Sequence, residues 1–188
     1  MVAIRRLFAI AAFAACVAAH AGLKEGAIAY SRGDFATTLR ELKPLAEQGQ
    51  PLAQYLVGSS LVNAKPPLGN VGEGEDWLKK AAGQGQIAAM RDLGALNLFG
   101  KKDRAEARQW LLQAADRGDA EAQHLMALYL LDGPEAEASR GEAYMWLHLA
   151  AERGHVLSGV MLTTVRPPFS PEQRADGLRR AGEWKPVR

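Results

Sequence analysis

Cysteine is almost missing from this chain. Its one cysteine, Cys16, lies in an N-terminal stretch that we expect to be removed, so the predicted mature protein has none. Without cysteine a protein has no disulfide, no thiolate nucleophile and no cysteine-ligated metal. We therefore expect the fold to be stabilised by its hydrophobic core alone.

An excess of charge of either sign is also missing. The 188 residues include 23 Lys+Arg and 21 Asp+Glu, which gives a formal net charge of +2. Arg5 and Arg6 account for that excess, and the remaining acidic and basic residues are interspersed. Such a neutral surface does not favour nucleic acid or an anionic membrane as a partner. Ordinary proportions of hydrophobic (48%) and charged (23%) residues exclude wholesale disorder.

The first 21 residues have the pattern of an export signal. Arg5 and Arg6 form a positive start, residues 7–19 are uncharged and apolar, and residues 19–21 read Ala-His-Ala. This ending has the small-x-small pattern that signal peptidases recognise. We therefore predict a secretory signal peptide over residues 1–21 and a periplasmic mature protein that begins near Gly22.

Two other interpretations of residues 1–21 have less support from the sequence. A retained membrane anchor is disfavoured because residues 7–19 are fewer than the roughly 20 that span a bilayer. Lipoprotein anchoring at Cys16 is disfavoured because residues 13–15, Phe-Ala-Ala, lack the aliphatic residue usual three positions before a lipidated cysteine. We expect no membrane span after cleavage.

The rest of the chain is a repeat. Four segments align on a glycine, at residues 49, 85, 118 and 154, so that the spacings are 36, 33 and 36 residues. The segments read Leu42-x-x-Leu45-Ala46-x-x-Gly49, Trp77-Leu78-x-x-Ala81-Ala82-x-x-Gly85, Trp110-Leu111-x-x-Ala114-Ala115-x-x-Gly118 and Trp146-Leu147-x-x-Ala150-Ala151-x-x-Gly154. Small residues follow each glycine at fixed distances: Ala53 and Gly58, Ala89 and Gly94, Ala122 and Ala127, Ser158 and Thr163.

The period predicts a helix, a turn and a second helix. Each Trp and the two alanines after it share one helical face, and the glycine fits the left-handed residue that ends a helix. Starts of helices are indicated by Asp103-x-x-Glu106, Ser139-x-x-Glu142 and Ser170-Pro171-Glu172-Gln173. The predicted fold class is all-α.

These repeats resemble the Sel1-like repeat, a relative of the tetratricopeptide repeat. The resemblance is carried by residues 53–58, 122–127 and 146–154, and the opening over residues 26–35 is similar to a tetratricopeptide helix pair. It implies a right-handed α-solenoid of about five antiparallel helix pairs over residues 22–184, followed by a short tail, 185–188. The predicted pairs are 22–32 with 34–48, 51–63 with 73–84, 86–99 with 103–117, 119–131 with 139–153, and 155–165 with 171–184.

Few residues suggest catalysis or cofactor binding. His148 and Glu152 stand four residues apart on one predicted helix, as a base and its orienting acid would, but no nucleophile has a spacing that partners them. The histidine spacings match no metal motif. The glycines of residues 69–74 lack the Gly-Lys-Ser/Thr ending of a phosphate loop. Because of their shared register, we expect Trp77, Trp110 and Trp146 to be buried between helices.

A binding surface is the better candidate. In tetratricopeptide-like stacks the first helix of each pair lines the concave face, and the resemblance implies the same here. Helical periodicity predicts that a mixed polar and aromatic strip faces solvent on these helices, a composition that suits peptide recognition. The predicted binding residues are Tyr30, Tyr55, Ser59, Asn63, Arg91, Glu121 and His124.

The sequence thus favours a monomeric, non-enzymatic interaction module without a cofactor. Its expected partner is a protein or peptide of the cell envelope, for which it would be an adaptor or regulator. Two alternatives remain open: a factor associated with envelope polysaccharide or peptidoglycan, and a hydrolase that uses His and Glu.

Overall fold

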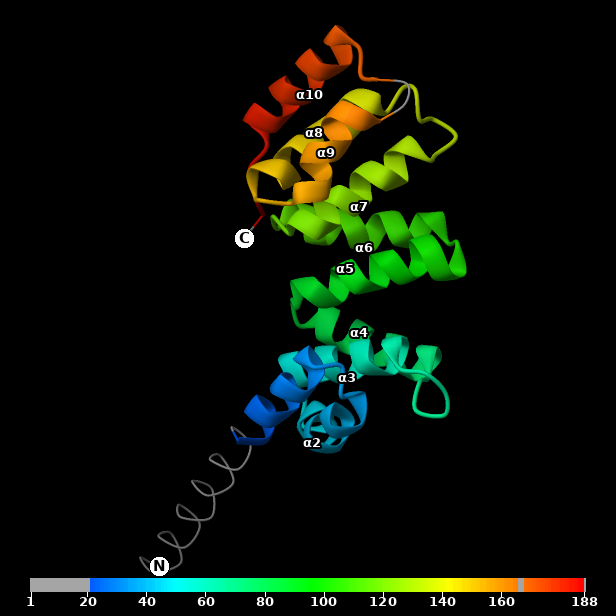
Figure 1. The fold of residues 1–188 in the computed structure, drawn as a ribbon, viewed down its shortest axis with the longest axis vertical. Helices are drawn as coiled ribbons and strands as arrows, with labels where there is room; N and C mark the ends of the chain where they lie inside the picture. The colour runs from blue at the N-terminus through cyan, green and yellow to red at the C-terminus, as the bar shows by residue number, and fades with distance from the viewer. Residues whose placement is uncertain (1–20, 166–167, 188) are drawn as a thin grey trace, which may run out of the picture. The chain divides into compact units, whose positions relative to one another are not determined.

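All regular structure in the described part of the chain is helical. The computed structural model describes residues 21–165 and 168–187 (Figure 1), so all of the expected signal peptide but Ala21 lies outside the described residues. In this part of the chain no helix is both long and apolar enough to cross a membrane. The prediction of an all-α fold is confirmed.

The chain divides after Gln86 into two compact units. We call residues 21–86 the N-terminal unit, and residues 87–165 with 168–187 the C-terminal unit. The N-terminal unit contains helical residues 21–31, α2 (Phe35–Glu47), α3 (Pro51–Asn63) and α4 (Val71–Gly83). The C-terminal unit contains α5 (Ile87–Ala95), a π-helical continuation (Leu96–Lys101), α6 (Arg104–Asp116), α7 (Ala120–Leu131), α8 (Arg140–Glu152), α9 (Val156–Thr164) and α10 (Pro171–Glu183). These bounds confirm the predicted helices to within a few residues.

Glycines end the helices as the repeat predicts. Gly49, Gly85, Gly118 and Gly154 have φ between +85° and +88°, the left-handed region that glycine enters without strain. Their shared conformation explains why the glycine is the most regular feature of the repeat.

The starts of the helices follow the predicted capping residues in two cases of three. Asp103 accepts a hydrogen bond from the backbone N–H of Glu106, at 3.0 Å. Ser170 and Gln173 form a complete capping box at the start of α10. Ser139 directly precedes α8, as predicted, but makes no side-chain cap. A capping box was expected at all three starts, and only Ser170 forms a complete one.

Each unit has its own core of aliphatic and alanine side chains. In the N-terminal unit Leu42, Val57 and Leu78 are fully buried, and in the C-terminal unit Leu93, Leu111 and Leu147 are. Small residues let neighbouring helices approach closely. A Cβ at Gly58 of α3 would lie 2.8 Å from the backbone oxygen of Gly74 in α4.

Candidate functional site

The predicted binding residues of the N-terminal unit lie together. The Tyr30 hydroxyl and the Ser59 hydroxyl are 2.8 Å apart, and the Tyr30 and Tyr55 rings are tilted with centroids 6.4 Å apart. Asn63 donates through Nδ2 to the Ser59 backbone oxygen at 2.8 Å and to Oγ at 3.2 Å. These contacts join helical residues 21–31 to α3.

The expectation that Ser59 faces solvent is wrong. Only 2% of the residue is exposed, because Tyr30 of helical residues 21–31 covers it. Tyr30 and Tyr55 are half-buried, and only Asn63 of the four is exposed. The helical period correctly placed Tyr55, Ser59 and Asn63 on one face of α3. It could not show that Tyr30, from another helix, lies on that face.

Arg91, in the C-terminal unit, joins two helices. Its guanidinium donates to Asp92 at 2.9 Å and to the Asp119 carboxylate at 3.3 Å. Asp119 is also the N-cap of α7, where it accepts from the Ala122 N–H at 2.8 Å. Arg91 is half-buried, so its ion pairs connect α5 to the start of α7.

His124 belongs to a buried cluster between α7 and α9. Its Nδ1 lies 2.9 Å from the Ser158 hydroxyl, and its ring centroid is 4.4 Å from that of His155. His155 in turn lies 2.9 Å from the Glu121 carboxylate through Nε2. The expectation that His124 faces solvent is wrong, since 6% of it is exposed, whereas Glu121 is exposed as predicted.

Burial of the ring lowers the pKa of His124 below its ordinary value of 6.5, and the nearby His155 lowers it further. Glu121 has the opposite, weaker effect. Taking a charged imidazole out of water is costly, which is the main reason that the pKa of His124 is lowered. Both effects, burial and the nearby His155, favour the neutral form of the His124 ring.

The sequence analysis missed a Ser-His-Glu chain in this cluster. Ser158 Oγ lies 2.9 Å from His155 Nδ1, and His155 Nε2 lies 2.9 Å from Glu121. A nucleophile, a base and an acid have this connectivity in hydrolases. Ser158, however, is fully buried, and His155 is the N-cap that accepts from the Ser158 backbone N–H. The arrangement therefore begins α9 and joins it to α7, and does not present a hydroxyl to a substrate.

An apolar groove lies on the same helices, toward their C-terminal ends. The cavity has a volume of about 320 Å³ and lies between the π-helical segment, α7 and α9. Phe99 is 60% exposed at its edge, and Leu157, one helical turn before Met161 on α9, is 62% exposed. We call the face made by α5 with its π-helical end, α7 and α9 the first-helix face. The residues lining the groove are Leu98, Phe99, Leu128, Leu131, Asp132, Met161 and Val165.

The tryptophans pack as expected in two positions of three. Trp77 is 8% exposed and Trp146 is 2% exposed, but Trp110 is only half-buried. A shared partner that the sequence analysis missed is a glutamate four residues earlier. The indole N–H of Trp110 donates to Glu106 at 3.2 Å, and that of Trp146 donates to Glu142 at 3.3 Å.

The other candidates for catalysis or for metal and phosphate binding do not form a site in the described residues. His148 Nε2 lies 3.5 Å from Glu152, and its ring stacks on Tyr144. Over residues 21–165 and 168–187, no three His, Cys, Asp or Glu side chains are grouped as a metal site requires. Residues 69–74 run into the start of α4, where Asn70 accepts from the Glu73 N–H and Glu73 is bound by Lys43.

Helix pairs that recur every 33 to 36 residues define an α-solenoid. The Sel1 repeat family model matches residues 51–86, 87–119 and 120–155, which is more than half of the chain. The three matches begin at the first residues of α3, α5 and α7. The chain belongs to the Sel1 repeat family.

A solved structure supports the same fold. The crystal structure of a Sel1 repeat protein from Oxalobacter formigenes is similar over 88% of this chain and 70% of that chain, with 22% sequence identity and a TM-score of 0.64. No curated protein matches the chain. Sel1 repeats indicate a protein–protein interaction module, which agrees with the predicted function class.

Proposed function

We propose that the protein is a non-enzymatic interaction module that binds an apolar segment of a protein partner on the first-helix face of its C-terminal unit. The observation that carries the proposal is the apolar groove, with Phe99 60% exposed at its edge. Exposed aromatic and aliphatic side chains beside a concave apolar surface are typical of peptide-binding sites.

The same face has a polar end that would orient a bound segment. Glu121 and His155 lie near the starts of α7 and α9, and the groove lies near the ends of these helices. A segment that places apolar side chains in the groove and a basic residue beside Glu121 would match both ends. In this proposal Glu121 contacts the partner, as the sequence predicted. Arg91 and His124 instead stabilise the first-helix face through contacts between its helices.

We further propose that the protein is exported and acts in the periplasm as an adaptor or regulator of an envelope protein or complex. The support is the Arg-Arg start, the apolar run and the Ala-His-Ala ending of residues 1–21, together with the lack of cysteine after residue 16. N-terminal sequencing of protein isolated from cells should find Gly22 or a close neighbour. Met1 or an acylated Cys16 at the N-terminus would contradict export by this route.

The binding proposal is tested by placing charge in the groove. In Phe99→Asp with Met161→Asp, capture of the partner identified with the wild-type protein should fall at least tenfold, because a carboxylate must then be desolvated against apolar surface. Leu178→Asp is the matched control, since Leu178 of α10 is 46% exposed and outside the groove. Undiminished capture by a folded double variant would refute the proposed site.

A further inference from the structure

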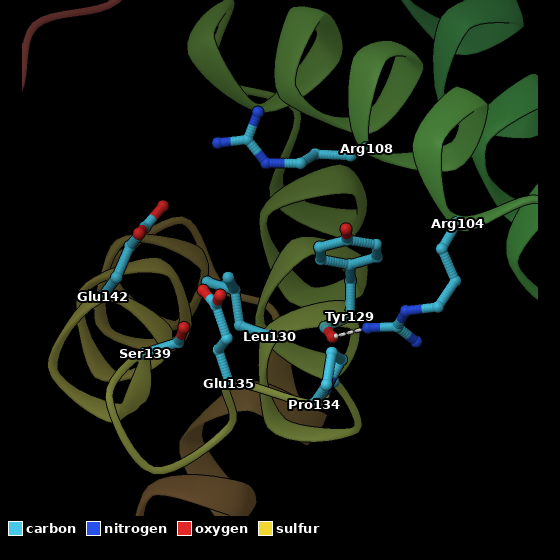
Figure 2. Close-up of a pocket in the computed structure, with 9 residues that line it drawn as sticks. Arg104, Arg108, Tyr129, Leu130, Pro134, Glu135, Ser139 and Glu142 are labelled. Atoms are coloured by element: carbon cyan, nitrogen blue, oxygen red, sulfur yellow. Dashed lines mark hydrogen bonds between the residues drawn. The ribbon is translucent and has the colours of Figure 1, made fainter.

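A second hollow in the C-terminal unit shares no lining residue with the apolar groove. Its volume is about 370 Å³, within the range of small-molecule sites. Its walls come from α6, the end of α7, the segment between α7 and α8, and the start of α8 (Figure 2). The lining residues are Arg104, Arg108, Tyr129, Leu130, Gly133, Pro134, Glu135, Ser139 and Glu142.

Two walls of this hollow are fixed by contacts within the unit. Arg104 donates to the Tyr129 backbone oxygen at 2.7 Å, and its guanidinium lies 4.3 Å from the centre of the Tyr129 ring. Gly133 makes room for it, because a Cβ there would lie 2.8 Å from the Arg104 Nη2. On the opposite wall Glu142 is held by the Trp146 indole at 3.3 Å. The wall formed by Arg104 and Tyr129 and the carboxylate of Glu142 are therefore held in place before a ligand binds.

The other polar side chains of the hollow have no partner in the described part of the chain. Arg108 makes no hydrogen bond or ion pair there, and neither does the Glu135 carboxylate. The Ser139 hydroxyl does not cap α8. Figure 2 shows Arg108 extending from α6 on one side, with Glu135, Ser139 and Glu142 on the other. Opposite charges thus line one cavity without neutralising each other.

We propose that this hollow binds a small zwitterion of amino-acid or dipeptide size. Arg108 would bind the ligand carboxylate, for which a guanidinium offers two parallel donors. Glu135 and Glu142 would bind the ammonium group, and the Tyr129 ring would cover the ligand's apolar part. A simple anion would be repelled by the two glutamates, and a simple cation by Arg108, so only a ligand with both charges satisfies all three groups.

The test is an NMR titration of the ¹⁵N-labelled protein with alanine, dialanine, N-acetyl-dialanine and dialanine amide. Saturable shifts of the Ser139 and Glu142 backbone amides are expected with a zwitterionic probe, and each capped dipeptide should bind at least tenfold more weakly. The comparison of alanine with dialanine distinguishes a single amino acid from a dipeptide as the ligand.

Variants assign the charges. Arg108→Ala and Glu142→Gln should each weaken binding of the zwitterion at least tenfold, and the glutamine keeps an acceptor for the Trp146 indole. Arg174→Ala, at an exposed position of α10 outside the hollow, is the matched control. Equal binding of capped and free dipeptides, full binding by a folded Arg108→Ala protein, or no saturable shift with any probe would overturn the proposal.

Discussion

The N-terminal and C-terminal units place different residues at one position of the repeat. Three residues before the small residue of each first helix stand Tyr55, Arg91 and His124. Tyr55 lies beside the Tyr30 ring in the N-terminal unit. In the C-terminal unit Arg91 pairs with Asp119, and His124 contacts Ser158 and His155. Hydroxyl and ring contacts in one unit are thus replaced by ionic and imidazole contacts in the other.

The two units also differ in what they leave open. In the N-terminal unit Tyr30 closes over Ser59, so that this polar surface is satisfied internally. In the C-terminal unit the groove beside Phe99, Leu128 and Met161 stays apolar and accessible. The comparison shows that one repeat register can bury its polar contacts in one unit and leave an apolar groove open in the other.

The largest expected effect compares a buried tryptophan with a half-buried one. Trp146→Ala should lower the free energy of unfolding by about 3–5 kcal/mol, the usual cost of deleting a buried large aromatic side chain. Trp110→Ala should cost about 1–2 kcal/mol, because a half-buried ring removes less apolar area from water. Denaturant titrations followed by circular dichroism compare the two. Equal losses would show that exposure does not distinguish these positions.

A medium effect compares helix contacts in the two units. Gly58→Ala should destabilise the protein by about 1–3 kcal/mol, since its Cβ would lie 2.9 Å from the Leu78 backbone nitrogen. Gly94→Ala should cost less, because its two contacts at 2.6 Å are with the Leu111 side chain and its nearest backbone atom, the Leu111 nitrogen, is farther away at 3.1 Å. Gly83→Ala, with no atom within 4 Å, is the control and should be neutral or slightly stabilising. Thermal melts that rank Gly94→Ala below Gly58→Ala in stability would reverse the comparison.

The smallest expected effect is a pH dependence that arises from His124 of the C-terminal unit. The pKa of His124 is lowered in the folded protein, so below about pH 6.5 the unfolded chain takes up a proton that the folded protein resists. This contribution to stability is full above pH 6.5 and is lost as pH falls through the lowered pKa.

His124→Gln, which cannot titrate, should therefore lose less stability than wild type between pH 7 and pH 5. The neighbouring groups are the same in the variant and in the wild type. Ser158 and His155 contact residue 124, and Glu121 contacts His155. The free energy of unfolding, measured at each pH, gives the comparison. Identical slopes for the two proteins would show that His124 does not couple stability to pH.

The fold was predictable because its signals are local and repeated. Gly49, Gly85, Gly118 and Gly154 all occupy the left-handed conformation that their register predicts. The burial of Ser59 and His124 was not predictable, since it depends on Tyr30 and His155 from other helices. Periodicity assigns a residue to a face of its own helix, but it does not report which distant side chain packs there.

The groove was missed for a related reason. Phe99 belongs to a π-helical segment, Leu96–Lys101, in which the ordinary helical period no longer applies. Val165 lies just after the last residue of α9. Leu128 and Leu131 look like core residues of α7 in the sequence, although they line the groove. The sequence did contain one signal of an apolar surface. Three apolar residues that lie exposed on α9 follow one another closely: Val156, Leu157 and Val160.

The most direct test of the central claim is site-specific photo-crosslinking in cells, with the photoreactive residue at position 99 or at position 55. Both positions lie on first helices or their continuation, but only Phe99 borders the groove. Our account predicts that position 99 crosslinks to one defined protein, that Met161→Asp abolishes this product, and that position 55 does not give it. A product from position 55 alone, or one from position 99 that persists with Met161→Asp, would contradict the assignment of partner binding to the groove.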